Sequence, residues 1–317
     1  MTLSATPRDG VLIERDDLAY LDTRALEWEP LPGLPGAQRK VLTRNGQGEP
    51  LAFLFHLPPA FAPGGLPRRH AHRSVTELTL ALAGELPVWE YSDADQQHGT
   101  LVRQRPGYAA HRLPGSLHGL EPGPRTPVGF TGLMIRTGPG NWVGEPGFAG
   151  ETVEMPYAAG WRAADDQVEA RPEPGSGVVV DRPGVRIVDS EAMEWTPLGQ
   201  YGRGKVLARD AAGSPLLMLQ HVAPDFALPG HPDRHSHAHD QHDLVLWGEF
   251  PMAEYERGSG HGRQILMKAG HFVHRRGGEI HGLVTGATSP TGCLTLQWYT
   301  DGQGNLVVGG GGTVDET

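Results

Sequence analysis

The stretch RHAHRSVTELTLALAGELPVWEY, residues 69–91, carries the pattern on which our fold prediction depends. His70 and His72 are two residues apart, so their side chains share one face if this segment is a strand. Glu77 follows after a short interval, and His118 lies further along the chain. Three imidazoles and one carboxylate suit a divalent transition metal such as Fe, Mn, Ni, Zn or Co. The sequence therefore predicts a metal site formed by these four side chains.

The pattern recurs about 165 residues later in the chain, as in duplicated domains. Residues 234–255 read RHSHAHDQHDLVLWGEFPMAEY, in which Gly248 aligns with Gly84. Further along, His281 aligns with His118. Self-similarity at a nearly fixed period indicates repeated structural units. We therefore predict two tandem domains of one fold.

The second copy has an altered set of candidate ligands. His235, His237 and His281 keep the three-histidine pattern, whereas Gln241 occupies the position of Glu77. Glutamine is a neutral and weaker oxygen ligand, so this site has one negative charge fewer. The sequence leaves open whether the site binds a metal through its histidines and water, holds a different metal or stays empty. Because the first copy keeps all four ligands, we expect the main catalytic centre there.

Short apolar segments bounded by Gly, Pro, Asn or Asp run through both halves. The chain has 45 glycines and 28 prolines in 317 residues, as expected for many turns between short strands. No helical periodicity persists beyond about ten residues. The predicted strands are 51–57, 78–83, 128–135, 216–222, 244–247 and 294–299. We therefore predict an all-β chain of two tandem antiparallel jelly-roll barrels.

The domain boundary is expected in a polar segment near the middle of the chain. Residues 163–177 are rich in Asp, Glu, Pro and Gly, a composition typical of linkers. The predicted domains are an N-terminal barrel with an N-terminal arm at 1–160, a linker at 161–180 and a C-terminal barrel at 181–317.

The spacing of these residues resembles the two signature motifs of the cupin superfamily, and the whole chain resembles a bicupin. The first motif, G-x5-H-x-H-x4-E-x6-G, is matched in full from Gly64 to Gly84. The second motif runs from Gly107 to His118, with Leu113 where the family usually has proline. The segments before each barrel also resemble anti-sigma-factor-type cupins and ketone-cleaving dioxygenases. The resemblance implies a jelly-roll barrel in each half, with the four side chains of the first half as metal ligands and His235, His237, Gln241 and His281 as their counterparts.

A further histidine occupies the same position in both halves. His111 and His274 each precede the last histidine of their set by the same interval. We predict that His111 is catalytic, either by contacting substrate or by orienting a ligand. The alternative is a packing histidine common to the fold, because internal repetition supports fold as readily as function.

Composition and charge narrow the classes of partner. The formal net charge is −10 and the pI about 5.9, which disfavours a nucleic-acid partner. We find no apolar run of membrane-spanning length and no secretory signal, and therefore expect a cytoplasmic protein. Cys293 aligns with an apolar position of the first half and is expected in the core. The expected partner is a small-molecule substrate, and self-association is left open.

Three functions fit the predicted site. The first is a non-haem iron dioxygenase that cleaves a C–C bond in a small enol, phenolic or hydroxyketone substrate, with Fe(II) as cofactor. The second is a redox-neutral isomerase, lyase, decarboxylase or cyclase that uses Mn, Ni or Zn as a Lewis acid. The third is a non-catalytic bicupin that binds a small molecule or a metal. The ligand pattern alone does not separate the three, and the family resemblance favours the first.

Overall fold

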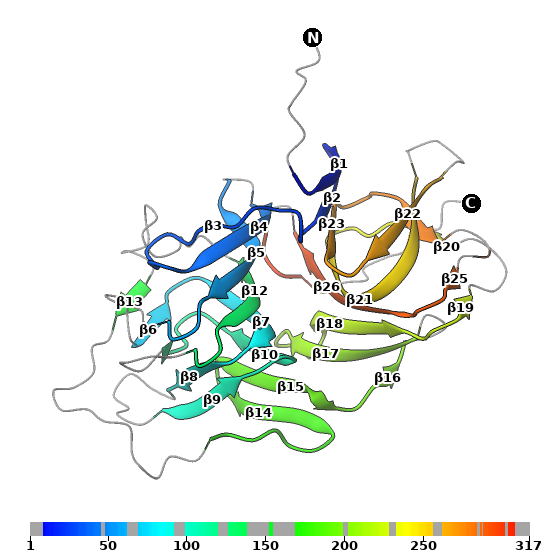
Figure 1. Cartoon of the computed structure of the whole chain (residues 1–317). Helices are drawn as coiled ribbons and strands as arrows, with labels where there is room; N and C mark the ends of the chain where they lie inside the picture. The colour runs from blue at the N-terminus through cyan, green and yellow to red at the C-terminus, as the bar shows by residue number, and fades with distance from the viewer. Residues whose placement is uncertain are drawn as a thin grey trace, which may run out of the picture. The chain divides into compact units, whose positions relative to one another are not determined.

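β-strands are the regular elements of the part of the chain that the computed structural model describes. The described residues are 9–45, 48–61, 69–91, 99–119, 126–137, 152–154, 169–198, 202–227, 233–255, 262–283, 286, 288–301 and 304–307. Paired strands are antiparallel throughout the named sheets (Figure 1). The predicted all-β class is therefore confirmed, and all six predicted strands fall on observed ones.

Residues 28–194 form the first of two units. Its larger sheet consists, in spatial order, of β14 (Ser176–Arg182), β15 (Val185–Met193), β10 (Tyr108–Arg112), β7 (Thr76–Gly84), β12 (Phe130–Thr137), β5 (Pro50–Leu57), β4 (Gln38–Arg44) and β3 (Glu29–Pro30). Its smaller sheet consists of β13 (Thr152–Glu154), β6 (Arg69–His72), β11 (His118–Gly119), β8 (Leu86–Glu90) and β9 (Thr100–Gln104). We call this unit the first barrel.

Residues 1–27 and 195–317 form the other unit, which we call the second barrel. The main path of its sheet runs through β1 (Val11–Arg15), β2 (Leu18–Asp22), β23 (His271–Arg275), β21 (Asp240–Tyr255), β26 (Cys293–Thr300), β18 (Pro215–Val222), β17 (Arg203–Arg209) and β16 (Thr196–Pro197). Attached to it are β20 (Asp233–His235), β22 (Gly262–Lys268) and β24 (His281–Leu283), and a separate ribbon pairs β19 (Phe226–Ala227) with β25 (Thr288–Ser289).

The units differ from the domain ranges expected from the sequence. The N-terminal strands β1 and β2 pair within the second barrel, where β2 lies against β23 (Figure 1). Conversely, β15 pairs with β10 and completes the sheet of the first barrel. Part of the expected linker therefore forms β14, and residues 161–168 of that linker lie outside the described residues. Composition suggested a linker because edge strands such as β14 alternate exposed and buried positions and so contain polar residues.

A glycine at the same place in each barrel allows two strands to approach closely. Gly84 and Gly248 have φ of +78° and +77°, in the left-handed region that favours glycine. A Cβ added at either position would lie 2.0 Å from a carbonyl oxygen, that of Gly129 or Gly292 respectively. The glycine of the repeated motif is therefore required by backbone packing.

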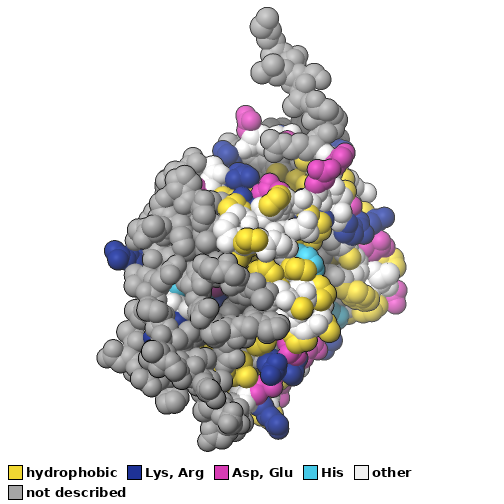
Figure 2. Space-filling view, turned by 60° about the vertical axis from the view of Figure 1, so that its left-hand side comes forward, with side chains coloured by type: hydrophobic (Ala, Val, Ile, Leu, Met, Phe, Trp, Pro, Cys, Tyr) yellow, Lys and Arg dark blue, Asp and Glu magenta, His cyan; other side chains and the backbone are white. Residues whose placement is uncertain are grey.

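The surface and the core both agree with expectations from composition. On the face seen in Figure 2, acidic and basic side chains are interspersed. Among the described residues, no helix is long and apolar enough to cross a membrane. Cys293 is 1% exposed within an apolar cluster, and burial raises the pKa of its thiol to about 12. The prediction of a core cysteine is confirmed, and its thiol is not activated.

Candidate metal centres

Three histidines of the first barrel meet at one point. His70 and His72 lie on β6, and the register of β6 and β11 places His118 opposite His70. The ring centroids of His70 and His118 are 4.4 Å apart, and those of His72 and His118 are 5.9 Å apart. One nitrogen of each ring lies within 4.8 Å of one nitrogen of each of the others. The three predicted imidazoles are therefore close enough to share an ion, given small rotations toward metal–nitrogen distances of about 2.1 Å.

A backbone hydrogen bond orients the third imidazole of this cluster. Nδ1 of His118 lies 3.1 Å from the carbonyl oxygen of Ser116, which can only accept, so Nδ1 carries the proton. Nε2 of His118 then keeps its lone pair and faces Glu77 at 3.8 Å. Burial lowers the pKa of His118 well below its usual value, and burial lowers that of His72 to about 3 despite the nearby Glu77. Both rings are therefore neutral at physiological pH, the form that binds metals.

Glu77, the predicted fourth ligand, is shared with a buried arginine. Its Oε1 accepts a 2.7 Å hydrogen bond from Nη1 of Arg112, and its Oε2 lies 3.7 Å from Nε2 of His72. Arg112 also donates to Glu90 at 2.6 Å. Burial would raise the pKa of Glu77, but Arg112 and the nearby His72 and Arg136 lower it on balance. The carboxylate is therefore ionised, with Oε1 bound by Arg112 and also facing His118, and Oε2 directed toward His72.

The described part of the first barrel contains a cluster of buried apolar side chains. Phe55, Phe130 and Met134 belong to this cluster, together with Ala81 of β7. A Cβ added to Gly132 of β12 would lie 2.8 Å from Phe130 and 2.9 Å from Phe55. Gly132 therefore packs closely against two aromatic rings of this core.

The second barrel repeats the three-histidine cluster. His235 lies opposite His281 in the pairing of β20 with β24, and their ring centroids are 4.5 Å apart. The ring of His237 is 5.0 Å from that of His235, and the three ligand nitrogens again lie within 4.8 Å of one another. Nδ1 of His281 lies 3.1 Å from the carbonyl oxygen of Glu279, so Nε2 keeps its lone pair. That Nε2 is buried and has no hydrogen-bond partner among the described residues.

Gln241 lies beside these histidines with its amide orientation fixed. Its Nε2 donates a 3.0 Å hydrogen bond to Oδ2 of Asp243. The opposite amide orientation would place two acceptors against each other, so the assignment follows from the chemistry of the partner. Oε1 of Gln241 is buried and has no hydrogen-bond partner among the described residues. The structure thus places a neutral oxygen, which could serve as a metal ligand, where the first barrel has Glu77.

A buried charge network in the second barrel was not recognised from the sequence. Arg275 donates to Asp243 at 2.6 Å and to Glu254 at 2.8 Å, and Tyr20 hydrogen bonds to both Arg275 and Glu254. Arg275 and Glu254 correspond to Arg112 and Glu90 of the first barrel, and this identity within the repeat was the signal that could have found them. In the first barrel the other carboxylate bound by the arginine is Glu77, whose counterpart is Gln241. In the second barrel it is Asp243, two residues further along the strand.

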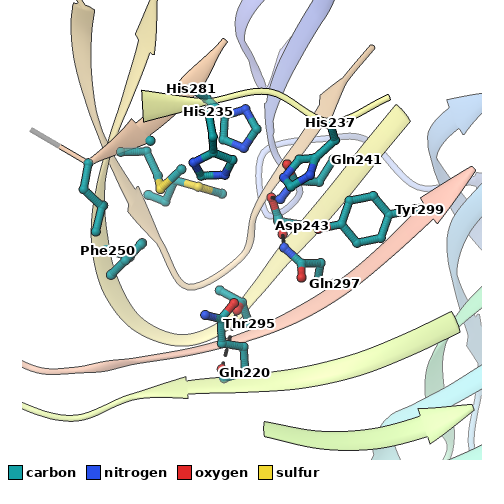
Figure 3. A pocket seen from close by; sticks show the side chains of 14 residues that line it. Gln220, His235, His237, Gln241, Asp243, Phe250, His281, Thr295, Gln297 and Tyr299 are labelled. Carbon is teal, nitrogen blue, oxygen red and sulfur yellow. Dashed lines mark hydrogen bonds between the residues drawn. The ribbon is translucent and has the colours of Figure 1, made fainter. Parts of the chain in front are cut away.

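A cavity of about 210 Å³ lies beside the second cluster (Figure 3). One wall is polar and is formed by side chains of β18, β21 and β26, and the other is apolar and formed around β21, β22 and β24. The polar wall comprises Gln220, Gln241, Asp243, Thr295, Gln297 and Tyr299, and the apolar wall comprises Phe250, Met252, Met267 and Leu283. The three histidines also line this cavity, so an ion bound there would face it.

His111, the predicted catalytic residue, is not brought to the first cluster. In the pairing of β10 with β7, His111 lies opposite Leu78, whereas its neighbour Arg112 lies opposite Glu77. Adjacent residues of a strand point to opposite faces, so His111 faces away from Glu77. Burial lowers the pKa of His111 to about 4. Its catalytic role stays a prediction that this geometry does not support.

Both clusters fit a divalent transition metal. Each offers three imidazoles, at least one of them oriented by a backbone carbonyl, as metal-ligating histidines usually are. Buried lone pairs directed at a common point are costly without a cation or a proton. In the first barrel Glu77 stands next to the histidines, and in the second Gln241 does. The donor sets do not distinguish Fe from Mn, Ni or Zn.

The comparisons with known proteins agree with this architecture. No family model and no curated protein sequence matches the chain. Among solved structures, protein Ylba from E. coli matches with a TM-score of 0.55 at 10% identity, covering 91% of this chain and 93% of that chain. The chain therefore shares the all-β, antiparallel fold of this solved structure.

Two further solved structures share this fold over most of their length. A candidate dioxygenase from Nostoc punctiforme matches with a TM-score of 0.54 at 12% identity, covering 92% of this chain and 86% of that chain. The oxalate decarboxylase of Lactobacillus farciminis, solved as a formate complex, has a TM-score of 0.51 at 12% identity, with coverage of 89% and 86%. At these identities the similarity establishes the fold, and the activity has to be inferred from the site.

Proposed function

We propose that the chain is a metal-dependent enzyme that acts on a small organic substrate in the cavity of the second barrel. The observation that carries this proposal is the position of His235, His237 and His281, which line a cavity with one polar and one apolar wall. Three protein nitrogens leave coordination positions open, which distinguishes catalytic from closed structural metal sites. The sequence pattern alone favoured the first barrel, whose interior contains a packed apolar cluster.

The proposed reaction is oxidative cleavage of a C–C bond in a small enol, phenolic or hydroxyketone substrate by a non-haem iron dioxygenase. Divalent iron held by the three imidazoles would polarise a substrate oxygen and provide the electron transfer that dioxygen chemistry requires. In such a cleavage both oxygen atoms enter the two products, so no external reductant is consumed. A neighbour in the same fold is a candidate dioxygenase, which is consistent with this chemistry but does not establish it.

The residues of the cavity have separable roles in this proposal. Gln220, Thr295 and Gln297 form the polar wall that would orient the oxygen-bearing edge of the substrate. Phe250 and the neighbouring methionines would hold the carbon skeleton and exclude water. Burial and the nearby Asp243 raise the pKa of Tyr299, so its hydroxyl keeps its proton and can donate a hydrogen bond at neutral pH.

Metal analysis and oxygen uptake test the proposal together. Protein purified without a polyhistidine tag and reconstituted with Fe(II) should bind iron and consume dioxygen in the presence of a small enol or hydroxyketone substrate. Substrate conversion should stop under strict anaerobiosis. Turnover that continues without dioxygen would instead support the redox-neutral lyase or isomerase class, of which the decarboxylase neighbour is an example in this fold.

A further inference from the structure

The two barrels differ in a coordinated way at two cross-strand pairs next to the histidines. In the first barrel β7 and β12 pair Glu77 with Arg136 and Thr79 with Met134. In the second barrel the corresponding pairs, between β21 and β26, are Gln241 with Tyr299 and Asp243 with Gln297. Residues two apart on a strand share a face, so the carboxylate has moved by one pleat along the same face. At the second of these pairs, the residue on the partner strand has changed from Met134 to the amide Gln297.

Asp243 fixes the orientation of two glutamine side chains. Oδ2 of Asp243 accepts from Nε2 of Gln241, and Oδ1 accepts from Nε2 of Gln297, both at 3.0 Å. Because each amide uses its N–H group on the carboxylate, its carbonyl oxygen must point elsewhere. Both glutamines line the cavity together with Asp243 (Figure 3). The part of the polar wall formed by Gln241, Asp243 and Gln297 therefore presents hydrogen-bond acceptors.

Away from the three histidines, the described lining of the cavity offers no permanent positive charge to an anion. The residues described as lining it include no lysine or arginine. The guanidinium of Arg275, which binds the lining residue Asp243, is 1% exposed and is also engaged by Glu254 and Tyr20. At the position of Tyr299, the first barrel has the buried cation Arg136. A carboxylate on a ligand would thus meet acceptors and a second carboxylate along this wall.

We infer that the second-barrel cavity selects uncharged ligands bearing N–H or O–H donors over carboxylates, and that Asp243 is the positioning residue for this selectivity. The inference rests on the proposed function, since it concerns the same cavity. It narrows the substrate to a neutral molecule with a hydrogen-bond donor on the edge that faces Gln241 and Gln297. A site built from fixed acceptors discriminates strongly against a ligand that cannot donate.

Binding of two matched probes to zinc-loaded protein tests the inference without turnover. The probes are para-hydroxybenzamide and para-hydroxybenzoate. They have nearly the same size and the same phenol group, but the first carries an uncharged amide and the second a carboxylate. Titration calorimetry should show the amide binding at least about tenfold more tightly. In Asp243→Asn the two glutamine amides can rotate, and the preference should fall to within about twofold at unchanged zinc content.

Controls separate this inference from the proposed metal chemistry. Thr79→Asn changes the corresponding position of the first barrel and should leave the preference unaltered. Gln297→Met, which copies the first barrel, removes one acceptor and should weaken the preference even if Asp243→Asn fails to fold. Equal or tighter binding of the carboxylate by the unmodified protein, or binding of neither probe, would overturn the inference. Loss of zinc binding would concern the proposed function instead.

Discussion

The two barrels share several residues at and around the histidine cluster but differ in the side chains of the barrel interior beside it. Each has three histidines, a buried arginine and a glutamate at repeated positions. In the interior the first barrel has Phe55 paired with Gly132, whereas the second has Gln220 paired with Thr295. The same strands thus enclose an apolar core in one copy and a polar cavity in the other. The histidine geometry is therefore common to both copies, whereas the side chains of the interior differ between them.

Removing one histidine from each cluster in turn should have the largest effect on turnover and should show the clearest difference between the two barrels. His281→Ala should lower metal content by about half and reduce turnover by more than about a thousandfold, because the affected cluster faces the cavity. His118→Ala should lower metal content similarly with much less loss of turnover. Metal analysis and steady-state kinetics on both variants would measure this, and the reverse ranking would return catalysis to the first barrel.

Filling the cavity should have the next largest effect. Gln220→Phe introduces the residue that stands at the equivalent position of the first barrel, and should reduce turnover by about a hundredfold while both metals remain bound. The matched change in the first barrel, Phe55→Leu, removes core contacts and should cost about 1 kcal/mol of stability without affecting turnover. Kinetics, metal content and denaturant unfolding would distinguish the two. If Gln220→Phe kept full activity, the cavity would not be the substrate site.

His111 should affect only the dependence of stability on pH. Burial lowers the pKa of His111 to about 4, so the folded state keeps this ring neutral while the unfolded chain takes up a proton below about pH 6.5. Stability is therefore lost as pH falls from about 6.5 toward 4, by up to about 3 kcal/mol from this group. His111→Leu should remove that part of the loss, as measured by denaturant unfolding at pH 5 and pH 8. A large loss of turnover in this variant would restore the catalytic prediction.

The sequence predicted the features that depend on local spacing. The period-two pattern of His70 and His72 placed both imidazoles on one face, and the repeat located their counterparts in the second half. These features could be predicted because strand geometry and the repeat determine them within a few residues.

Other features depend on contacts that spacing does not encode. The exchange of Glu77 for Gln241 was visible in the sequence, but the compensating Asp243 became recognisable only from its hydrogen bonds with Arg275, Gln241 and Gln297. The pairing of Gly132 with Phe55 and with Ala81 likewise depends on the register of β5, β12 and β7, which local spacing does not encode.

The N-terminal strands β1 and β2 have a consequence for how the chain reaches its native state. Leu18 pairs with Arg275, so β2 is synthesised long before its partner strand β23 and can pair only after β23 has been made. Contacts of such long sequence separation slow folding. Removing residues 1–27 would expose the edge of β23, and an exposed strand edge can pair with other molecules and cause aggregation. A protein designed to contain the second barrel alone would therefore have to include β1 and β2 together with residues 195–317.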